Sequence, residues 1–282
     1  MKRILRSTLA AALTLGALAF AAPAATASTS GVNDNSCRPT AAHPEPVILW
    51  HGLGSNGDTD MGAIGQNLSS AGYCVFYKTY GTTYYGPYTG GLASMRSSAA
   101  ELGAYVNQIR SLTGAAKVDI VGHSEGTTVP AYYLKFLGGS SVVAKFVGYG
   151  SNFKGTTLGG LQALADLTGF RPVLDAGGCQ ACNEFAPNSQ FTADLNAGGV
   201  SVAGPQYTSI VSQYDEVVQP YTSGVLAAAP NVTNYTLQDV CPTDFNGHVG
   251  QTLDPNVWAL VRNALDPAHA TPVSCVPMPF YG

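Results

Sequence analysis

The run Gly-His-Ser-Glu-Gly at residues 122–126 has the residue types and spacing best suited to covalent chemistry in this chain. A serine on a sharp turn between a strand and a helix projects its hydroxyl above the sheet. Glycines two positions before and after it remove side chains that would clash in the turn. The pattern gains weight because it follows a strand-like run at 117–121 and precedes a helix-like run. We therefore predict that Ser124 is a nucleophile for acyl transfer.

A serine hydroxyl is a weak nucleophile, so it needs a histidine as general base and a carboxylate that orients the histidine ring. Among the five histidines, His248 follows the last predicted strand and precedes the last predicted helix. This position completes the chain order Ser, acid, His, so we predict that His248 is the base. We interpret His51 as a loop-shaping residue and His123 as a residue that packs or hydrogen-bonds locally, and we expect the other two, His43 and His269, to be exposed.

Several acidic residues compete for the third role. Asp215 directly follows a predicted strand and is our choice on strand-end position and chain order. Glu216 is kept in reserve, while Asp239 and Asp244 lie closer in sequence to His248 in a cysteine-bearing loop.

Acyl transfer also places negative charge on the former carbonyl oxygen, which rigid backbone amides can stabilise. The residue after the nucleophile, Glu125, should supply one amide, and Leu53, between Gly52 and Gly54, should supply the other. We interpret the Glu125 side chain as an acid at a helix start, favoured there by the helix dipole. The two amides would together form an oxyanion hole.

These groups need elements to position them, and strands alternate with helices along the chain after an extended arm at 28–45. The alternation predicts an α/β fold with a mostly parallel sheet and helices on both faces, and ligands bind beyond the carboxyl ends of such strands. The predicted strands span 46–50, 73–77, 117–121, 144–149, 207–212 and 232–237. Helices are predicted over 92–112, around 132–137 after the turn, with Pro130 near its start, and over 255–265.

The first 27 residues have the order of a secretory signal, with basic residues, an apolar stretch and Ala-Thr-Ala before the predicted cleavage point. The apolar stretch is shorter than the roughly 20 residues that a bilayer span needs, and no other stretch is long and charge-free enough. We therefore expect a secreted, extracellular protein without a stable membrane span. Its residues 28–282 would form a single catalytic domain, because no repeat or linker divides them.

Without the leader, the chain has ten basic and 17 acidic side chains. This net negative charge argues against a nucleic-acid partner, because phosphates require a basic surface. We expect a monomer that needs no cofactor. Carboxylates such as Asp244 and Asp254 suit calcium, but their spacing matches no recognisable calcium loop, so we predict no metal site.

The six cysteines all lie beyond the leader, and an even number in an exported chain indicates disulfides. Sequence permits about 15 pairings of six cysteines. We favour the sequential set, in which each bond ties a loop or terminus to a nearby element: Cys37 with Cys74, Cys179 with Cys182, and Cys241 with Cys275. The alternative, a zinc or redox half-site at residues 179–182, lacks the further ligands of a tetrahedral set.

Taken together, these motifs resemble those of secreted bacterial lipases of the α/β-hydrolase superfamily, close to the actinobacterial class 2 triacylglycerol lipases. The resemblance spans most of the mature domain, and its motifs are His-Gly-Leu-Gly at 51–54, the run 113–124, Asp-Glu-Val-Val at 215–218 and Gly-His at 247–248. It implies a serine ester hydrolase acting on acylglycerols, in which Ser124, Asp215 and His248 match the triad positions. Relatives usually carry Gln or Met at position 125 and a second glycine at 127, where this chain has Glu and Thr.

Three other functions remain open on the sequence. A polyester or cutin-like hydrolase would share the triad, and an extracellular acyltransferase would pass the acyl group to an alcohol instead of water. A wall-associated binding protein would have to carry the three roles in order by coincidence. We also expect residues 150–205, which include Leu161 and Phe170, to line the acyl site, because apolar residues there lie between two predicted core strands.

Overall fold

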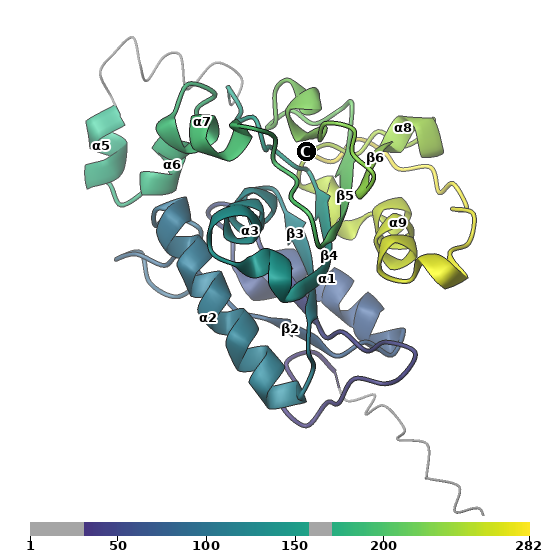
Figure 1. Cartoon of the computed structure of the whole chain (residues 1–282). Helices are drawn as coiled ribbons and strands as arrows, with labels where there is room; N and C mark the ends of the chain where they lie inside the picture. Colours follow the sequence, from purple (N-terminus) through teal and green to yellow (C-terminus); the bar gives the residue numbers. More distant parts are fainter. Residues whose placement is uncertain (1–30, 158–170) are drawn as a thin grey trace, which may run out of the picture.

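The computed structural model describes residues 31–157 and 171–282. The predicted leader, residues 1–27, therefore lies outside the described residues, as do Leu161 and Phe170. The described strands form one six-stranded sheet in which every neighbouring pair is parallel, in the order β2-β1-β3-β4-β5-β6 (Figure 1). These strands are β1 (Val47–Trp50), β2 (Val75–Tyr77), β3 (Val118–His123), β4 (Val143–Tyr149), β5 (Gln206–Val211) and β6 (Val232–Thr236).

Helices cover both faces of this sheet (Figure 1). The described α-helices are α1 (Gly57–Ser70), α2 (Met95–Thr113), α3 (Glu125–Phe136), α5 (Arg171–Ala176), α6 (Gln180–Glu184), α7 (Gln190–Asn196), α8 (Leu237–Val240) and α9 (Pro255–Leu265). Core residues of α2 and α3 pack on one face, and those of α1 and α9 pack on the other. The predicted fold class, a parallel α/β sheet between helices, is confirmed.

Strand β1 shows why the sequence pattern predicts this sandwich. Its side chains alternate, so that Ile48 and Trp50 join the core under α2 and α3, while Val47 and Leu49 join the core under α1 and α9. A strand covered on both faces has no solvent side and reads as one continuous apolar run. All four residues are fully buried.

Helix α1, the short helices α5, α6 and α7, and the four-residue helix α8 are absent from the predictions. Helix α1 contains three glycines and two serines, but the Asn56 side chain caps it by accepting from the amide of Thr59, and it buries Met61, Ile64 and Leu68. Burial of this stripe outweighs the weak intrinsic propensity of the segment. Helices α5, α6 and α7 have only six, five and seven residues, which is too short for a periodic pattern to be recognised. They lie together at one end of the molecule, beyond α2 and α3 (Figure 1).

Three disulfides join Cys37 to Cys74, Cys179 to Cys182, and Cys241 to Cys275, which is the sequential pairing that the sequence favours. Such bonds are typical of proteins from oxidising compartments. No helix within residues 31–157 and 171–282 is long and apolar enough to span a bilayer.

Candidate active site

Ser124 lies in the sharp turn between β3, which ends at His123, and α3, which begins at Glu125. Its backbone has φ 55° and ψ −122°, a strained conformation for a residue that is not glycine. The flanking positions have no room for a side chain. A Cβ at Gly122 would collide with the carbonyl of Gly126, and a Cβ at Gly126 would collide with the carbonyl of Trp50. The turn thus holds Ser124 at the carboxyl end of a central strand.

The structure brings Ser124, His248 and Asp215 together in one hydrogen-bonded chain. The Oγ atom of Ser124 lies 2.8 Å from Nε2 of His248, and Nδ1 of His248 lies 2.7 Å from Oδ2 of Asp215. A carboxylate only accepts hydrogen bonds, so Nδ1 carries the proton and Nε2 is left to accept from the serine hydroxyl. This is the tautomer that a general base needs.

The Asp215 carboxylate is held from several sides. Its Oδ1 atom accepts from the amides of Val217, at 3.0 Å, and Val218, at 2.7 Å, while the Gln251 amide donates to Oδ2 at 3.3 Å. Burial acts to raise the pKa of Asp215, but the His248 ring and the backbone amides of Val218 and Val217 together lower it below its ordinary value. The group is therefore ionised at neutral pH.

Glu216, the reserve candidate for the acid, has a different contact. Its Oε2 atom accepts from the backbone amide of His248 at 2.9 Å, whereas the imidazole ring of His248 contacts Asp215. It supports the loop that carries the base. Gln251 links the same region to β4, because its Oε1 atom accepts from the amide of Gly150 at 3.0 Å.

The two amides predicted to stabilise an oxyanion flank Ser124. A Cβ at Gly52 would lie 3.0 Å from the Cβ of Ser124, so the loop that carries Leu53 packs directly against the serine. Within the described residues, neither the Leu53 amide nor the Glu125 amide donates a backbone hydrogen bond. Both therefore remain available as donors beside the nucleophile.

The other histidines have structural contacts. His51 is buried, its Nδ1 atom donates to the Gly52 carbonyl at 2.8 Å, and its Nε2 atom accepts from the Tyr80 amide at 3.2 Å. It shapes the loop, as the sequence suggests. His269 is exposed as expected, whereas His43 is only partly exposed because its ring stacks on Tyr73 at 3.8 Å.

The expectation that His123 makes only local contacts is wrong. Its Nδ1 atom lies 2.9 Å from Oδ1 of Asp60, and its Nε2 atom lies 3.2 Å from the carbonyl oxygen of His248. These partners are 63 and 125 positions away in the sequence. Asp60 is absent from the predicted site residues because helix α1, on which it lies, was not predicted. Two signals in the sequence indicate this helix: Asn56 as its N-cap, and the helical spacing of the apolar residues at 61, 64 and 68.

The Glu125 side chain also differs from expectation. It occupies the first residue of α3, but it is fully buried, and neither carboxyl oxygen has a hydrogen-bond partner among the described residues. A Cβ at Gly91 would lie 2.5 Å from Oε2 of Glu125 and 3.1 Å from the Cα of Leu53, so the carboxyl group lies behind the oxyanion loop. Burial raises the pKa of Glu125 well above its ordinary value, which favours the neutral acid in the folded protein.

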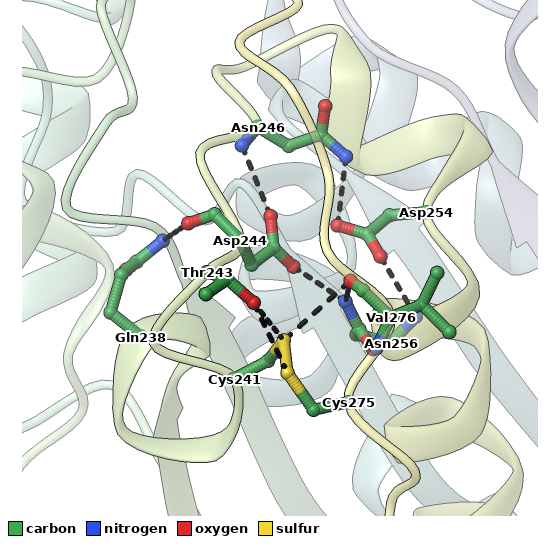
Figure 2. Close-up of a disulfide and its surroundings, with 9 residues drawn as sticks. All are labelled: Gln238, Cys241, Thr243, Asp244, Asn246, Asp254, Asn256, Cys275 and Val276. Carbon is green, nitrogen blue, oxygen red and sulfur yellow. Dashed lines mark hydrogen bonds between the residues drawn. A yellow bond between two sulfur atoms is a disulfide. The ribbon is translucent and has the colours of Figure 1, made fainter.

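A buried polar network holds the ends of the loop that carries His248 (Figure 2). The Asn246 side chain donates to Oδ2 of Asp254, and the Asn256 side chain donates to Oδ2 of Asp244, each at 2.9 Å. Asp254 also caps α9 by accepting from the Asn256 amide. Both aspartates are completely buried, and the Cys241–Cys275 disulfide lies beside them (Figure 2).

This network predicts a pH-dependent stability. Burial and the facing Asp244 carboxylate raise the pKa of Asp254 from 3.8 to about 7, although amide donors oppose the shift. The folded state then keeps a proton that the unfolded chain has released, so this group's contribution to the free energy of unfolding should fall from about pH 4 to about pH 7. Asp254→Asn keeps the cap without ionising, so its stability relative to the parent should improve over that range in denaturant titrations. A stability difference that is constant with pH would contradict the assignment.

Comparison with solved structures supports the fold. The crystal structure of lipase B from Aspergillus fumigatus aligns with a TM-score of 0.59 and 22% identity, over 82% of this chain and 54% of that one. The propeptide form of lipase BlEst2 from Bacillus licheniformis aligns with a TM-score of 0.51 and 18% identity, over 73% and 46%. A thermophilic esterase from Thermogutta terrifontis aligns with 0.51 and 15%, over 80% and 90%. The chain thus spans only about half the length of the first two, and together the likenesses identify an α/β-hydrolase fold.

The sequence also matches a family model. The model of lipase (class 2) matches residues 44–258, a range that includes Ser124, Asp215 and His248. The chain accordingly belongs to the class 2 lipase family.

Proposed function

We propose that this protein is an extracellular carboxylic ester hydrolase that acts on acylglycerols, with Ser124 as its nucleophile. The observation that carries the proposal is the continuous chain of hydrogen bonds from Ser124 through His248 to Asp215. Family membership supports a lipid ester as substrate. The signal-like first 27 residues and the three disulfides support secretion.

In this reaction the Ser124 Oγ atom attacks the ester carbonyl while Nε2 of His248 takes the hydroxyl proton. The amides of Leu53 and Glu125 stabilise the negative oxygen of the tetrahedral intermediate. The intermediate collapses, and His248 returns the proton to the departing alcohol, which leaves an acyl group on Ser124. Water, deprotonated by His248, then attacks the acyl carbonyl, and His248 passes that proton to the Ser124 Oγ atom as the bond between Oγ and the fatty acid breaks. Asp215 steadies the imidazolium that forms in each half of the cycle.

The test combines turnover with chemical labelling. The secreted protein should hydrolyse soluble p-nitrophenyl esters and emulsified triacylglycerols, and a p-nitrophenyl alkylphosphonate should release one equivalent of nitrophenol while attaching to Ser124, as located by peptide mass spectrometry. Labelling without turnover of any ester would oppose an ester hydrolase, and turnover without labelling of Ser124 would oppose the nucleophile. Adding methanol or glycerol measures how much acyl group passes to an alcohol, and transfer that exceeds hydrolysis in water would favour an acyltransferase.

A further inference from the structure

A second acid–histidine pair lies beside the candidate triad, with no part in the reaction described above. His123 is the last residue of β3 and directly precedes Ser124, while Asp60 lies in the first turns of α1. The two side chains are only 5% and 6% exposed. Their hydrogen bond is bifurcated, because Nδ1 of His123 lies 2.9 Å from Oδ1 and 3.1 Å from Oδ2 of Asp60.

The partners of His123 determine its charge. Its Nδ1 atom faces a carboxylate and its Nε2 atom faces a backbone carbonyl, and both of these groups only accept hydrogen bonds. Both ring nitrogens must therefore carry a proton, which makes the ring an imidazolium. Burial opposes this charge, but the Asp60 carboxylate outweighs burial, and the pKa of His123 is raised. For Asp60, burial is likewise outweighed by the His123 charge, and its pKa is lowered.

The pair connects the two loops that flank Ser124. Oδ2 of Asp60 accepts from the amide of Gly52 at 2.6 Å, one residue before the Leu53 amide. On the other side, Nε2 of His123 donates to the carbonyl oxygen of His248 at 3.2 Å. One buried ion pair thus spans from the loop that would bind the oxyanion to the loop that carries the base.

Ring packing limits the movement of this bridge. The His123 ring stacks on Tyr149, with centroids 5.1 Å apart, and lies 4.9 Å from the His248 ring. Tyr149 pairs with His123 in the sheet, and its carbonyl accepts from the Ser124 amide at 3.0 Å. The bridge is therefore built on the same two central strands that position the nucleophile.

We propose that Asp60 and His123 are positioning residues for ester hydrolysis, which hold the oxyanion loop and the His248 loop at a set distance across Ser124. This inference rests on the proposed function of Ser124. A neutral histidine could donate to only one of its two partners, the Asp60 carboxylate or the His248 carbonyl, so the bridge needs the charged ring and its carboxylate partner. A displacement of a catalytic group by about 1 Å can lower the rate on the order of 100-fold. A bridge that fixes the distance between the two loops can therefore have a large effect on kcat.

The test compares Asp60→Asn and His123→Gln with the parent enzyme on a soluble ester. Each variant should lower kcat by about 10- to 100-fold with KM changed by less than about twofold, because misalignment affects the transition state more than substrate binding. An alkylboronic acid, which forms a tetrahedral adduct with the serine, should lose affinity in parallel with kcat/KM. Asp60→Glu, which keeps the carboxylate, should recover part of the lost kcat. Unchanged kcat in both Asp60→Asn and His123→Gln, or boronic acid affinity equal to the parent's, would overturn the proposal.

Asp119 provides a matched control. It is also buried, on the same strand as His123, and its carboxylate accepts from the amide and the Nζ atom of Lys145 at 2.9 and 3.2 Å, away from Ser124. Asp119→Asn should lower Tm while leaving kcat at the parent value. An equal loss of kcat in Asp119→Asn and Asp60→Asn would mean that the Asp60–His123 pair contributes only to the stability of the fold. That result would overturn the positioning role.

A spectroscopic measurement on the parent protein tests the proposal even if the variants fail to fold. In parent protein labelled with ¹⁵N-histidine at pH 6.5, where an ordinary histidine is only about half protonated, the ring identified as His123 by its contacts with the Tyr149 ring should show two protonated nitrogens. A single protonated nitrogen would overturn the proposal. Ser124→Ala separates the two levels of inference: an active Ser124→Ala enzyme opposes the proposed function itself, whereas an inactive one beside a fully active Asp60→Asn enzyme opposes only the bridge.

Discussion

Replacing Ser124 with alanine is expected to lower kcat for ester hydrolysis on the order of 10⁶-fold, by analogy with the loss in serine proteases. The variant keeps the fold, because the alanine Cβ fits where the serine Cβ already lies. What it loses is the atom that attacks the ester, together with the 2.8 Å hydrogen bond to His248. Initial rates on a soluble p-nitrophenyl ester, normalised to folded protein by circular dichroism, measure the effect.

His248→Ala should cost a similar factor, and the double variant Ser124→Ala/His248→Ala should be little worse than either single variant. The two residues act as a unit, so that removing one already abolishes the covalent route. Losses that multiply to a much larger factor in the double variant would show that the two side chains act independently. That result would contradict the proposed mechanism even if each single variant were inactive.

The second large effect is expected from Asp215→Asn, which should lower kcat on the order of 10⁴-fold near neutral pH. The asparagine amide can turn its NH₂ group toward Nδ1 of His248, which then accepts instead of donating. The ring proton moves to Nε2, and that atom can no longer accept the Ser124 hydroxyl proton. Stopped-flow measurement of the acylation rate with an activated ester isolates this step from product release.

Glu216→Gln is the comparison for the acid. Because Glu216 accepts from the His248 backbone amide and the glutamine oxygen can do the same, its loss of kcat should be smaller by at least about two orders of magnitude. The residue whose replacement causes the larger loss of kcat is the acid of the triad. A larger loss from Glu216→Gln than from Asp215→Asn would transfer the acid role to Glu216, and small losses from both would redirect the search to residues such as Asp239.

Much of the scaffold could be predicted because its signals are local. Strand β1 is an unbroken apolar run, α9 begins with proline in its first turn, and α2 ends at Gly114, whose φ of 76° suits the left-handed cap that glycine favours. Each signal depends on residues within a few positions of one another. Helix α1 could not be predicted so easily, because its Gly-rich sequence becomes helical through burial against the sheet.

The sequence by itself determined the parallel α/β sheet, the Gly-x-Ser-x-Gly turn, the order Ser124, Asp215, His248 and the preferred pairing of the cysteines. Only the tertiary structure decided that Asp60 and His123 form a buried bridge, that Glu125 is a fully buried acid, and that Asp244 faces Asp254. The physical reason is that charge state and hydrogen bonding depend on burial and on partners far away in the chain, such as the 125 positions between His123 and His248. No local pattern of residue types carries that information.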